Sequence, residues 1–510
     1  MNKFNNLIRT LLLKLLKTTR QKKRSRKTTA KKKPILFREL DFPAWVIGLV
    51  IFILTVFILW GQFNSGIQSI IGMVIMVSIV VFIFTYYLDR YNFGFRSKSE
   101  LVMLEGLIMV SMVMLIVGIK FLAQKNFIDI SGYFVPVSSG IMLITMLVGI
   151  PMALISLSVL GILLAIVNNF NFNFFLVSVA GGLVAIYSTH SVRNRRDITR
   201  AGIFISLANT VAILVIYLIH NELTSPLMKG PAWKDIIWGV LNGFVSAILA
   251  MGFLPYLEDL FSLVTNIKLM EIADFNQPLL KRLMLESPGT YHHSLLVGNL
   301  AETAAEVIGA DSLLARVGAY YHDIGKLTKP EYFTENQGNL FNKHEELSPN
   351  MSSLILISHV KDGVDLANKY NLNKMITDII EQHHGTGLIH YFYMKALEKD
   401  DPESVEETKY RYFGPKPKTV EAAIVMLADS VEAAVRTMEE PSYEQISNMV
   451  RTVINNKFTD GQLDDCNITL VNLHKIAGSF VNILKGIYHT RIEYDTAGNG
   501  NRDTDSKPSK

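Results

Sequence analysis

Tyr321-His322-Asp323-Ile324-Gly325-Lys326 places an imidazole and a carboxylate side by side near the end of a predicted helix. A nitrogen ligand next to an oxygen ligand suits a divalent transition metal. The dipeptide alone is a weak signal, because a His-Asp pair at a helix end is more often a solvated cap. Its weight depends on whether other metal-ligating side chains occupy comparable positions in the same part of the chain.

The 510-residue chain changes composition near its middle. Residues 42–261 consist mainly of Ile, Leu, Val, Met, Phe and Gly, whereas residues 263–490 have the mixture of a soluble domain. We therefore expect a transmembrane bundle over residues 41–262 and a separate domain over 263–490. The single cysteine, Cys466, rules out an internal disulfide framework and fits a reducing compartment.

Eight apolar segments are predicted to cross the membrane, because most have about 20 residues and almost no charge. They cover about residues 43–62, 66–87, 101–119, 131–149, 151–168, 172–189, 201–220 and 236–256. The arginine-bearing loops at 89–98 and 193–200 are placed in the cytoplasm by the positive-inside rule. Eight crossings then predict a multi-pass membrane protein whose N-terminus and second domain are both cytoplasmic.

Both ends of the chain are predicted to form tails. Residues 1–40 contain 14 lysines or arginines against one acid, Glu39, and form a basic cytoplasmic tail. A solvated tail and a tether to the anionic lipids of the bilayer are equally weighted interpretations, since the tail precedes a predicted span. A nucleic-acid polymer is not expected as a partner. Residues 491–510, rich in Gly, Asn, Asp, Ser and Lys, are predicted to be a disordered C-terminal tail.

The domain that follows the bundle is predicted to be all-helical, so the fold class of the whole chain is all-α. Residues 257–285 are expected to form a helical connector, and no alternating strand pattern separates the apolar-periodic segments after it. The helices are predicted at about 291–308, 312–325, 347–360, 374–384, 419–438, 443–457 and 468–487.

Seven residues of this domain could bind a metal: His293, His322, Asp323, His359, His383, His384 and Asp429. They are expected on the predicted helices, with His359 closing the third and Asp429 on an otherwise apolar face. A single His or Asp in such a place is more often a buried polar group of the core. Seven of them in one domain are hard to explain separately. A buried ionised aspartate also needs a cationic partner, and a metal is the most economical one.

These residues resemble the metal site of the HD-domain phosphohydrolase superfamily. The histidines at 359, 383 and 384 are similar to its two-metal subgroup, and segments 289–294, 318–326 and 357–363 closely resemble the seven-transmembrane HD family. The resemblance covers about residues 66–493. It implies a polytopic helical membrane bundle of about eight spans followed by an all-helical cytoplasmic HD domain, in a bacterial cell membrane. Members of that family hydrolyse cyclic di-AMP to pApA.

The resemblance also implies a role for each ligand. His293, His322, Asp323 and Asp429 would hold one divalent metal; His359, His383 and His384 would hold a second, with Asp323 bridging the two. Manganese or iron is expected from the family, and the nitrogen and oxygen ligands are compatible with either. A hydroxide bridging the two metals would attack phosphorus in line, and the 3′ oxygen would leave.

Three further residues are candidates for contact with the substrate. Lys326 stands three residues after Asp323 and could bind a nonbridging phosphate oxygen, which makes Asp323 and Lys326 the predicted catalytic residues. An ordinary lysine at a helix end is the equally weighted alternative. His344 and Thr386 could position the substrate or the leaving group.

The principal hypothesis is a membrane-anchored, metal-dependent phosphodiesterase that controls the level of cyclic di-AMP. One alternative is an HD hydrolase for another nucleotide, such as cyclic di-GMP or a nucleoside triphosphate. Another is a membrane receptor that binds nucleotide without turnover, which the intact ligand set disfavours. A transporter is disfavoured because the spans carry almost no charge.

Family members usually carry a large extracellular domain between the first span and the other seven, where this chain has only residues 63–65. We therefore assign no sensing role to such a domain here. The sequence leaves open whether the chain forms a homodimer.

Overall fold

The computed structural model describes residues 44–60, single positions between 68 and 82, and residues 98–125, 129–220, 232–337, 342–399 and 404–488. The predicted tails lie outside the described residues, as does most of the predicted span 66–87. All regular structure in the described ranges is helical, apart from one isolated bridge between Leu388 and Arg411. The predicted all-α class is therefore confirmed.

In the described part of the bundle, five helices are long and apolar enough to cross a membrane. They are α4 (Lys98–Gln124), α6 (Ile150–Val167), α7 (Phe172–Thr189), α8 (Arg195–Ile219) and α9 (Ala232–Phe261). A shorter apolar helix, α2 (Ala44–Trp60), packs against α4. These helices correspond to six of the eight predicted spans, and the total of eight stays a prediction.

The predicted span 131–149 is not one continuous helix. It consists of a short 3-10 helix, η2 (Gly132–Phe134), and an α-helix of 11 residues, α5 (Val137–Leu147). At about 1.5 Å per residue, α5 rises roughly 16 Å, about half of a hydrocarbon core that is about 30 Å thick. Pro136 separates the two pieces, because it has no N–H to donate.

Hydrogen bonds from α9 satisfy backbone carbonyl groups at the break between η2 and α5. The side-chain amide of Asn242 donates to the carbonyl of Tyr133 at 2.9 Å and to that of Val135 at 2.7 Å. Lipid offers no such partners, so irregular backbone at this depth is tolerated only where protein surrounds it. Every residue from Val137 to Thr145 is buried, which meets this condition.

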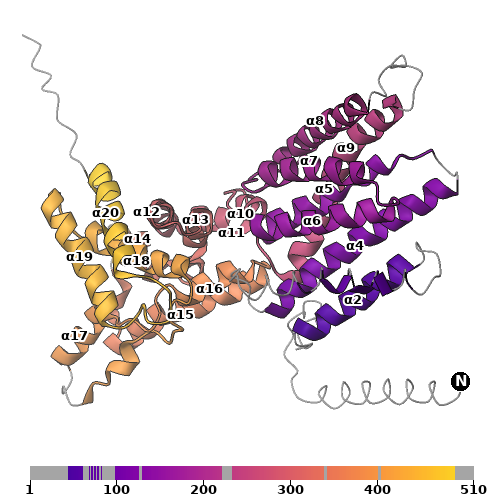
Figure 1. Cartoon of the computed structure of the whole chain (residues 1–510). Coiled ribbons are helices and arrows are strands. Elements are labelled where there is room, and N and C mark those ends of the chain that lie inside the picture. The colour runs from indigo at the N-terminus through magenta and orange to yellow at the C-terminus, as the bar shows by residue number, and fades with distance from the viewer. Residues whose placement is uncertain are drawn as a thin grey trace, which may run out of the picture.

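Two short helices begin the second domain on the side nearest the bundle, as Figure 1 shows: α10 (Asn266–Ile272) and α11 (Pro278–Glu286). Arg195, at the start of α8, forms an ion pair with Glu271 of α10 at 2.7 Å. The carbonyl of the next residue, Ile272, accepts a hydrogen bond from the hydroxyl of Tyr321 at 2.7 Å. Neighbouring residues of α10 thus contact the bundle on one side and the rest of the second domain on the other.

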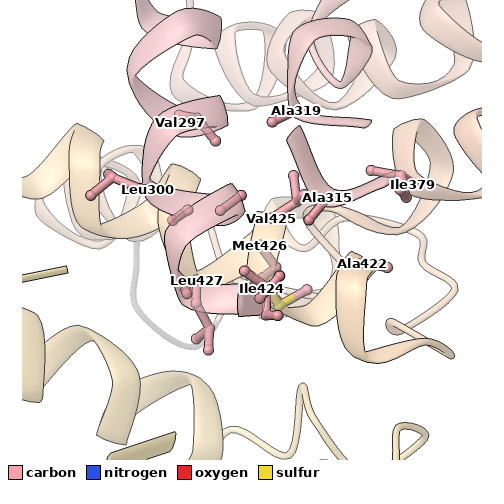
Figure 2. Packing of buried hydrophobic residues seen from close by; sticks show 14 of the residues in the cluster. Val297, Leu300, Ala315, Ala319, Ile379, Ala422, Ile424, Val425, Met426 and Leu427 are labelled. Atoms are coloured by element: carbon pink, nitrogen blue, oxygen red, sulfur yellow. The ribbon is translucent and has the colours of Figure 1, made fainter. Parts of the chain in front are cut away.

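The second domain is built around one central helix, α18 (Val420–Arg436). Each residue from Ile424 to Ala428 is 0% exposed, so α18 is apolar on all sides over this stretch. Figure 2 shows these side chains packed among residues of the neighbouring helices, Val297, Leu300, Ala315, Ala319 and Ile379. The surrounding helices are α12 (Pro288–Ile308), α13 (Ser312–Tyr321), α15 (Pro349–Lys369), α16 (Lys374–Gln382), α19 (Tyr443–Thr459) and α20 (Leu470–Tyr488).

Two helix ends differ from the prediction. The helix predicted over 312–325 ends at Tyr321, and a 3-10 segment, η4 (Ile324–Thr328), follows it. The helix predicted to close at His359 continues to Lys369. Helix α13 ends early because the chain turns into η4, which packs against α15. Helix α15 can continue past His359 because Gly363 has no side chain and leaves room for η4 on the helix surface.

Gly325 makes the contact between η4 and α15 possible. A Cβ atom at residue 325 would lie 1.8 Å from the carbonyl oxygen of His359 and 2.5 Å from the amide nitrogen of Gly363. Both neighbours are backbone atoms, which cannot rotate out of the way. The close approach of two backbones therefore holds Asp323 beside His359.

We predict that Gly325→Ala lowers the free energy of unfolding of the second domain by about 3 kcal/mol, the upper end of the range for overpacked cores. For a domain of this size, the midpoint of thermal unfolding should fall by roughly 6–12 °C. A thiol-reactive dye can follow this unfolding in the full chain, because Cys466 is partly buried in the domain.

Gly478→Ala is the matched control. Gly478 lies inside α20, and a Cβ there meets nothing within 4 Å. Alanine favours helix over glycine by about 0.5–1 kcal/mol, so the midpoint should stay unchanged or rise slightly. Equal midpoints for the two variants would contradict the backbone contact at Gly325.

Candidate metal centre

The structure brings all seven predicted ligands together, although they come from five different helices or their ends. His293 lies on α12, His359 on α15 and Asp429 on α18, whereas His322 and Asp323 follow α13 and the pair at 383 and 384 follows α16. They form two groups, within each of which the ligand atoms lie within 4.8 Å of one another. The groups are Asp323, His359, His383 and His384, and His293, His322 and Asp429.

The carboxylate of Asp323 lies between these two groups. Its Oδ2 atom is 3.2 Å from Nε2 of His322 and 3.6 Å from Nε2 of His293. Its Oδ1 atom is 3.3 Å from Nε2 of His359 and 3.7 Å from Nε2 of His383. One carboxylate thus presents a separate oxygen to each side of the site.

Asp429 faces the same space from the opposite helix. Its Oδ1 atom lies 3.1 Å from Nε2 of His293 and 3.8 Å from Nε2 of His322. Its Oδ2 atom lies 3.6 Å from Nδ1 of His384. The two carboxylates therefore enclose the cluster of imidazoles from both sides.

Three imidazoles are oriented by backbone carbonyls three residues earlier in the chain. The Nδ1 atoms of His322, His359 and His383 lie 2.7, 2.5 and 2.8 Å from the carbonyl oxygens of Ala319, Leu356 and Ile380, respectively. In the neutral form of each ring, a proton on Nδ1 makes this bond and the lone pair on Nε2 points into the site. Hydrogen bonds of this kind fix the ring and the tautomer of metal-ligating histidines.

His293 is oriented by a carboxylate that we did not predict. Its Nδ1 atom lies 2.5 Å from Oε2 of Glu432, a residue only 1% exposed. Arg436, one helical turn further along α18, approaches the same oxygen at 3.6 Å. The available signal was spacing, because Glu432 follows Asp429 by three residues and so shares its helix face.

His384 is held differently from the other histidines. Its ring is stacked on the ring of Tyr412, with 4.1 Å between centroids and 24° between planes. It presents Nδ1 to Asp429, whereas the other histidines present Nε2. Tyr412 was not predicted, and no local sequence signal connects it with a residue 28 positions earlier.

The acids are ionised and three of the imidazoles are neutral. Burial on its own would raise the pKa of Asp323, but His322 and Lys326 hold it well below its usual range. The pKa of Asp429 is also well below its usual range, because hydrogen bonds from the adjacent histidines outweigh burial. Burial lowers the pKa of His359, that of His384 strongly, and that of His383 to about 3. Ionised carboxylates and neutral imidazoles are the forms that bind metal ions.

The remaining two imidazoles face a concentration of negative charge. Burial opposes protonation of His322, yet Asp323 raises its pKa to about 10. Burial likewise opposes protonation of His293, and its contacts with Asp429 and Glu432 raise its pKa. Protons on these rings offset the negative charge of the carboxylates. A bound metal cation would offset the same charge in their place.

Buried atoms without hydrogen bonds mark the centre of the site. Among the described residues, Nε2 of His322 and both oxygens of Asp323 accept or donate no well-directed hydrogen bond. Buried polar atoms in proteins are otherwise almost always satisfied. Nitrogen and oxygen atoms that converge on one space without well-directed hydrogen bonds fit a divalent metal ion, so the residues present are compatible with the predicted metal centre.

Lys326 lies directly beside the cluster. Its ammonium group is 2.7 Å from Oδ2 of Asp323 and 2.8 Å from Oε1 of Glu335, and lies 5.0 Å from the centre of the Phe333 ring. These carboxylates outweigh burial and raise the pKa of Lys326, which therefore stays charged. Glu335, the second partner, was not predicted.

The other two predicted substrate residues lie outside the two ligand groups. Nε2 of His344 contacts the carbonyl of Tyr332 at 2.8 Å, and its ring packs near Phe392. The hydroxyl of Thr386, two residues after His384, accepts a hydrogen bond from the side-chain amide of Gln462 at 3.0 Å. Thr386 thus lies at the edge of the site, while His344 lies between the rings of Tyr332 and Phe392.

An apolar bundle joined to a helical domain with clustered histidines and aspartates defines a membrane protein of the HD class. The sequence matches the family described as "7TM receptor with intracellular HD hydrolase" over residues 67–265 and the HD domain over residues 290–434. The chain belongs to this seven-transmembrane HD family, which confirms the resemblance noted in the sequence.

Two similar proteins are both named cyclic-di-AMP phosphodiesterase PgpH. The one from Bacillus subtilis is 39% identical over 448 residues, covering 85% of this chain and 61% of the relative. The one from Listeria monocytogenes is 36% identical over 423 residues, covering 82% of this chain and 58% of the relative. The chain thus spans about three-fifths of the length of these relatives.

A solved structure of the L. monocytogenes PgpH HD domain in complex with cyclic-di-AMP is 48% identical to the matching part. The match covers 42% of this chain and 100% of that domain, with a TM-score of 0.41.

We predict that Glu432→Gln weakens divalent metal binding about ten-fold, because loss of a charged partner of a ligating histidine typically costs 10–100-fold in affinity. Competition between the purified full chain and a chromogenic manganese chelator measures this affinity directly. Glu439→Gln, which changes an exposed acid beyond the end of α18, is the control and should leave the affinity unchanged. Equal affinities for both variants would show that Glu432 does not support His293.

Proposed function

We propose that this protein is a membrane-anchored, metal-dependent phosphodiesterase that hydrolyses cyclic di-AMP to pApA and so controls the level of this second messenger. The position of Asp323 between two groups of ligands carries the proposal, since a shared carboxylate is what a two-metal hydrolase needs. The names of the two similar proteins support the choice of cyclic di-AMP as substrate.

The proposed ligand assignment follows the two sides of Asp323. His293, His322, Asp323 and Asp429 hold one divalent metal, and His359, His383 and His384 hold the other with Asp323 as the bridge. Two bound metals would neutralise charge on the phosphoryl oxygens and lower the pKa of a water that serves as nucleophile. The two proposed ions are manganese or iron, because either metal suits a mixed set of imidazole and carboxylate ligands.

The residues of the chain orient both the ligands and the substrate in this proposal. Asp323 and Lys326 are the catalytic residues, because the ammonium group of Lys326 lies beside Asp323 and can donate a further hydrogen bond to a nonbridging phosphate oxygen. Thr386 positions the substrate from the edge of the site, and His344 is the other proposed positioning residue. The closed packing around the cluster, where His322 and His383 are 0% exposed, keeps bulk water from the ligands.

A hydrolase for another nucleotide, or a receptor without turnover, is less well supported. The four-residue set of simpler HD hydrolases would not require His359, His383 and His384 to face Asp323. All seven ligand positions are occupied by residues that can bind a metal, which supports turnover rather than binding alone.

We further propose a division into a basic cytoplasmic tail (1–40), a transmembrane bundle (41–262), an HD domain (263–490) and a C-terminal tail (491–510). The bundle is multi-pass, with the N-terminus and the HD domain in the cytoplasm of a bacterial cell. The basic tail would contact anionic lipids of the bilayer.

The proposed orientation can be tested with single cysteines in a Cys466→Ser background. A membrane-impermeant maleimide should label Lys125→Cys in intact cells but label Ser191→Cys only after lysis, because α7 and α8 meet on the proposed cytoplasmic side. Both positions are exposed, so labelling reports sidedness rather than burial. Labelling of Ser191→Cys in intact cells would show that the orientation is the reverse of the one proposed.

We predict that the full chain in detergent with manganese converts cyclic di-AMP to pApA, as identified by the mass of the product. Replacement of both His322 and Asp323 by Ala should abolish turnover, because the substitutions remove the shared carboxylate and one imidazole. Chelation with EDTA should have the same effect, and added manganese should reverse it.

Membrane insertion and expression of the double variant serve as the control for folding. Hydrolysis retained by that variant would refute the site. Binding of cyclic di-AMP by the unaltered protein without hydrolysis would favour a receptor. Faster turnover of cyclic di-GMP than of cyclic di-AMP would reassign the substrate.

A further inference from the structure

We propose that Lys457 forms a second phosphate-binding subsite, which holds the phosphate of a cyclic dinucleotide that is not being cleaved. This inference rests on the proposed function, because it concerns the same substrate. A cyclic dinucleotide carries two phosphodiesters, each with one negative charge. Only one can lie at the metal ligands, so the other needs a cation elsewhere on the rim of the site.

Most cations around the site are already paired. Lys326 contacts Asp323 and Glu335, as described above. Arg411 forms ion pairs with Glu407 at 2.7 Å and with Asp460 at 3.0 Å. Lys416 lies 3.2 Å from Asp464, and Arg436 lies 3.6 Å from Glu432.

Lys457 differs from these cations, because no ion pair or hydrogen bond of its ammonium group occurs within the part of the chain that the structure describes. Its Nζ atom lies next to Gly387: a Cβ atom at residue 387 would be 3.2 Å from Nζ and 3.1 Å from the carbonyl oxygen of His384. The ammonium group is therefore placed against the segment that carries a proposed metal ligand.

Electrostatics agree with this placement. Burial lowers the pKa of Lys457, while the charges of Asp429 and Asp460 raise it. The ammonium group is therefore partly removed from water and within electrostatic reach of Asp429. An anion that binds between Lys457 and the metal ligands would gain a partner that solvent does not already satisfy.

Hydrogen bonds fix the end of α19, which carries Lys457, relative to the rest of the site. Gln462 accepts a hydrogen bond from the amide of Thr386 at 2.8 Å and donates one to Asp460 at 2.8 Å. Arg411 donates to the carbonyl of Thr386 at 2.9 Å and to Asp460. The end of α19, which bears Lys457, is thus tied to the segment after His384, so the subsite keeps a fixed position relative to the ligands.

The chemistry of the side chain suits a diester rather than a terminal phosphate. Lysine binds phosphate as a compact point charge, without the paired geometry of arginine. A phosphodiester offers only two nonbridging oxygens and one negative charge, which a single ammonium group can neutralise. Lys457 and the metal ligands together would then select a substrate whose two phosphates are separated by the distance found in a cyclic dinucleotide.

Steady-state kinetics of the full chain with manganese test the proposal with two substrates, cyclic di-AMP and bis(p-nitrophenyl) phosphate, which has a single phosphodiester. Lys457→Gln should raise KM for cyclic di-AMP about 10- to 100-fold, the range expected for a lost hydrogen bond to a charged group. The value of kcat should be unchanged, because the contact is made equally in ground and transition states. Both parameters for the single diester should also be unchanged.

Two further variants and one control accompany Lys457→Gln. Lys457→Arg keeps the charge and should restore part of the affinity for cyclic di-AMP. Gly387→Ala keeps the lysine but crowds its ammonium group, so it should raise KM for cyclic di-AMP alone, and it decides the question if Lys457→Gln does not fold. Arg451→Gln changes an exposed cation of the same helix and should leave KM and kcat unchanged for both substrates.

An unchanged KM for cyclic di-AMP in Lys457→Gln overturns the subsite while leaving the proposed function intact. Equal losses with both substrates also overturn it, because they indicate a structural role. Failure of the unaltered protein to hydrolyse cyclic di-AMP overturns the proposed function and this inference together.

Discussion

The second domain depends on placing one ionised carboxylate, that of Asp323, where water does not reach it. A buried charge of this kind costs several kcal/mol unless cations or strong hydrogen bonds surround it. Here four imidazoles and one ammonium group lie within 3.7 Å of its two oxygens. Three of these partners come from helices that pack on α18, or from their ends, and the other two come from α15 and η4, which pack on each other. The requirement to satisfy one side chain thus determines where five segments of the domain must meet.

Helix ends do most of this positioning. His322 and His383 each follow the last turn of a helix, where the carbonyl three residues earlier has no helical partner and can accept a bond from the imidazole. The ring is therefore oriented by backbone that the fold already provides, and no extra side chain is needed. His293 and His384 have no such carbonyl, and they rely instead on Glu432 and on Tyr412.

The all-α class and the seven residues that cluster in the candidate site could be predicted because their signals are local: apolar periodicity for the helices, and histidines or aspartates on helical segments for the site. Tyr412 could not be predicted. It meets His384 only through tertiary packing, and nothing in its own neighbourhood marks it. The break at Pro136 escaped prediction for a different reason, since the whole segment is apolar and hydropathy does not register a lost N–H. The continuation of α15 past His359 depends on Gly363, whose role is evident only once η4 lies against it.

The hydrogen bond from Tyr321 to Ile272 has a consequence for communication between the two halves of the chain. Tyr321 immediately precedes His322, and Ile272 immediately follows Glu271, which is held by Arg195 of the bundle. Two directly bonded contacts therefore separate the start of a membrane helix from the backbone of His322, a proposed metal ligand. A sliding or tilting of α8 in the bilayer would pull on α10 and reach the residue next to His322 through the buried side chain of Tyr321. The exposed ion pair is weak enough to break and re-form at little cost, which makes this link a reversible coupling rather than a rigid strut.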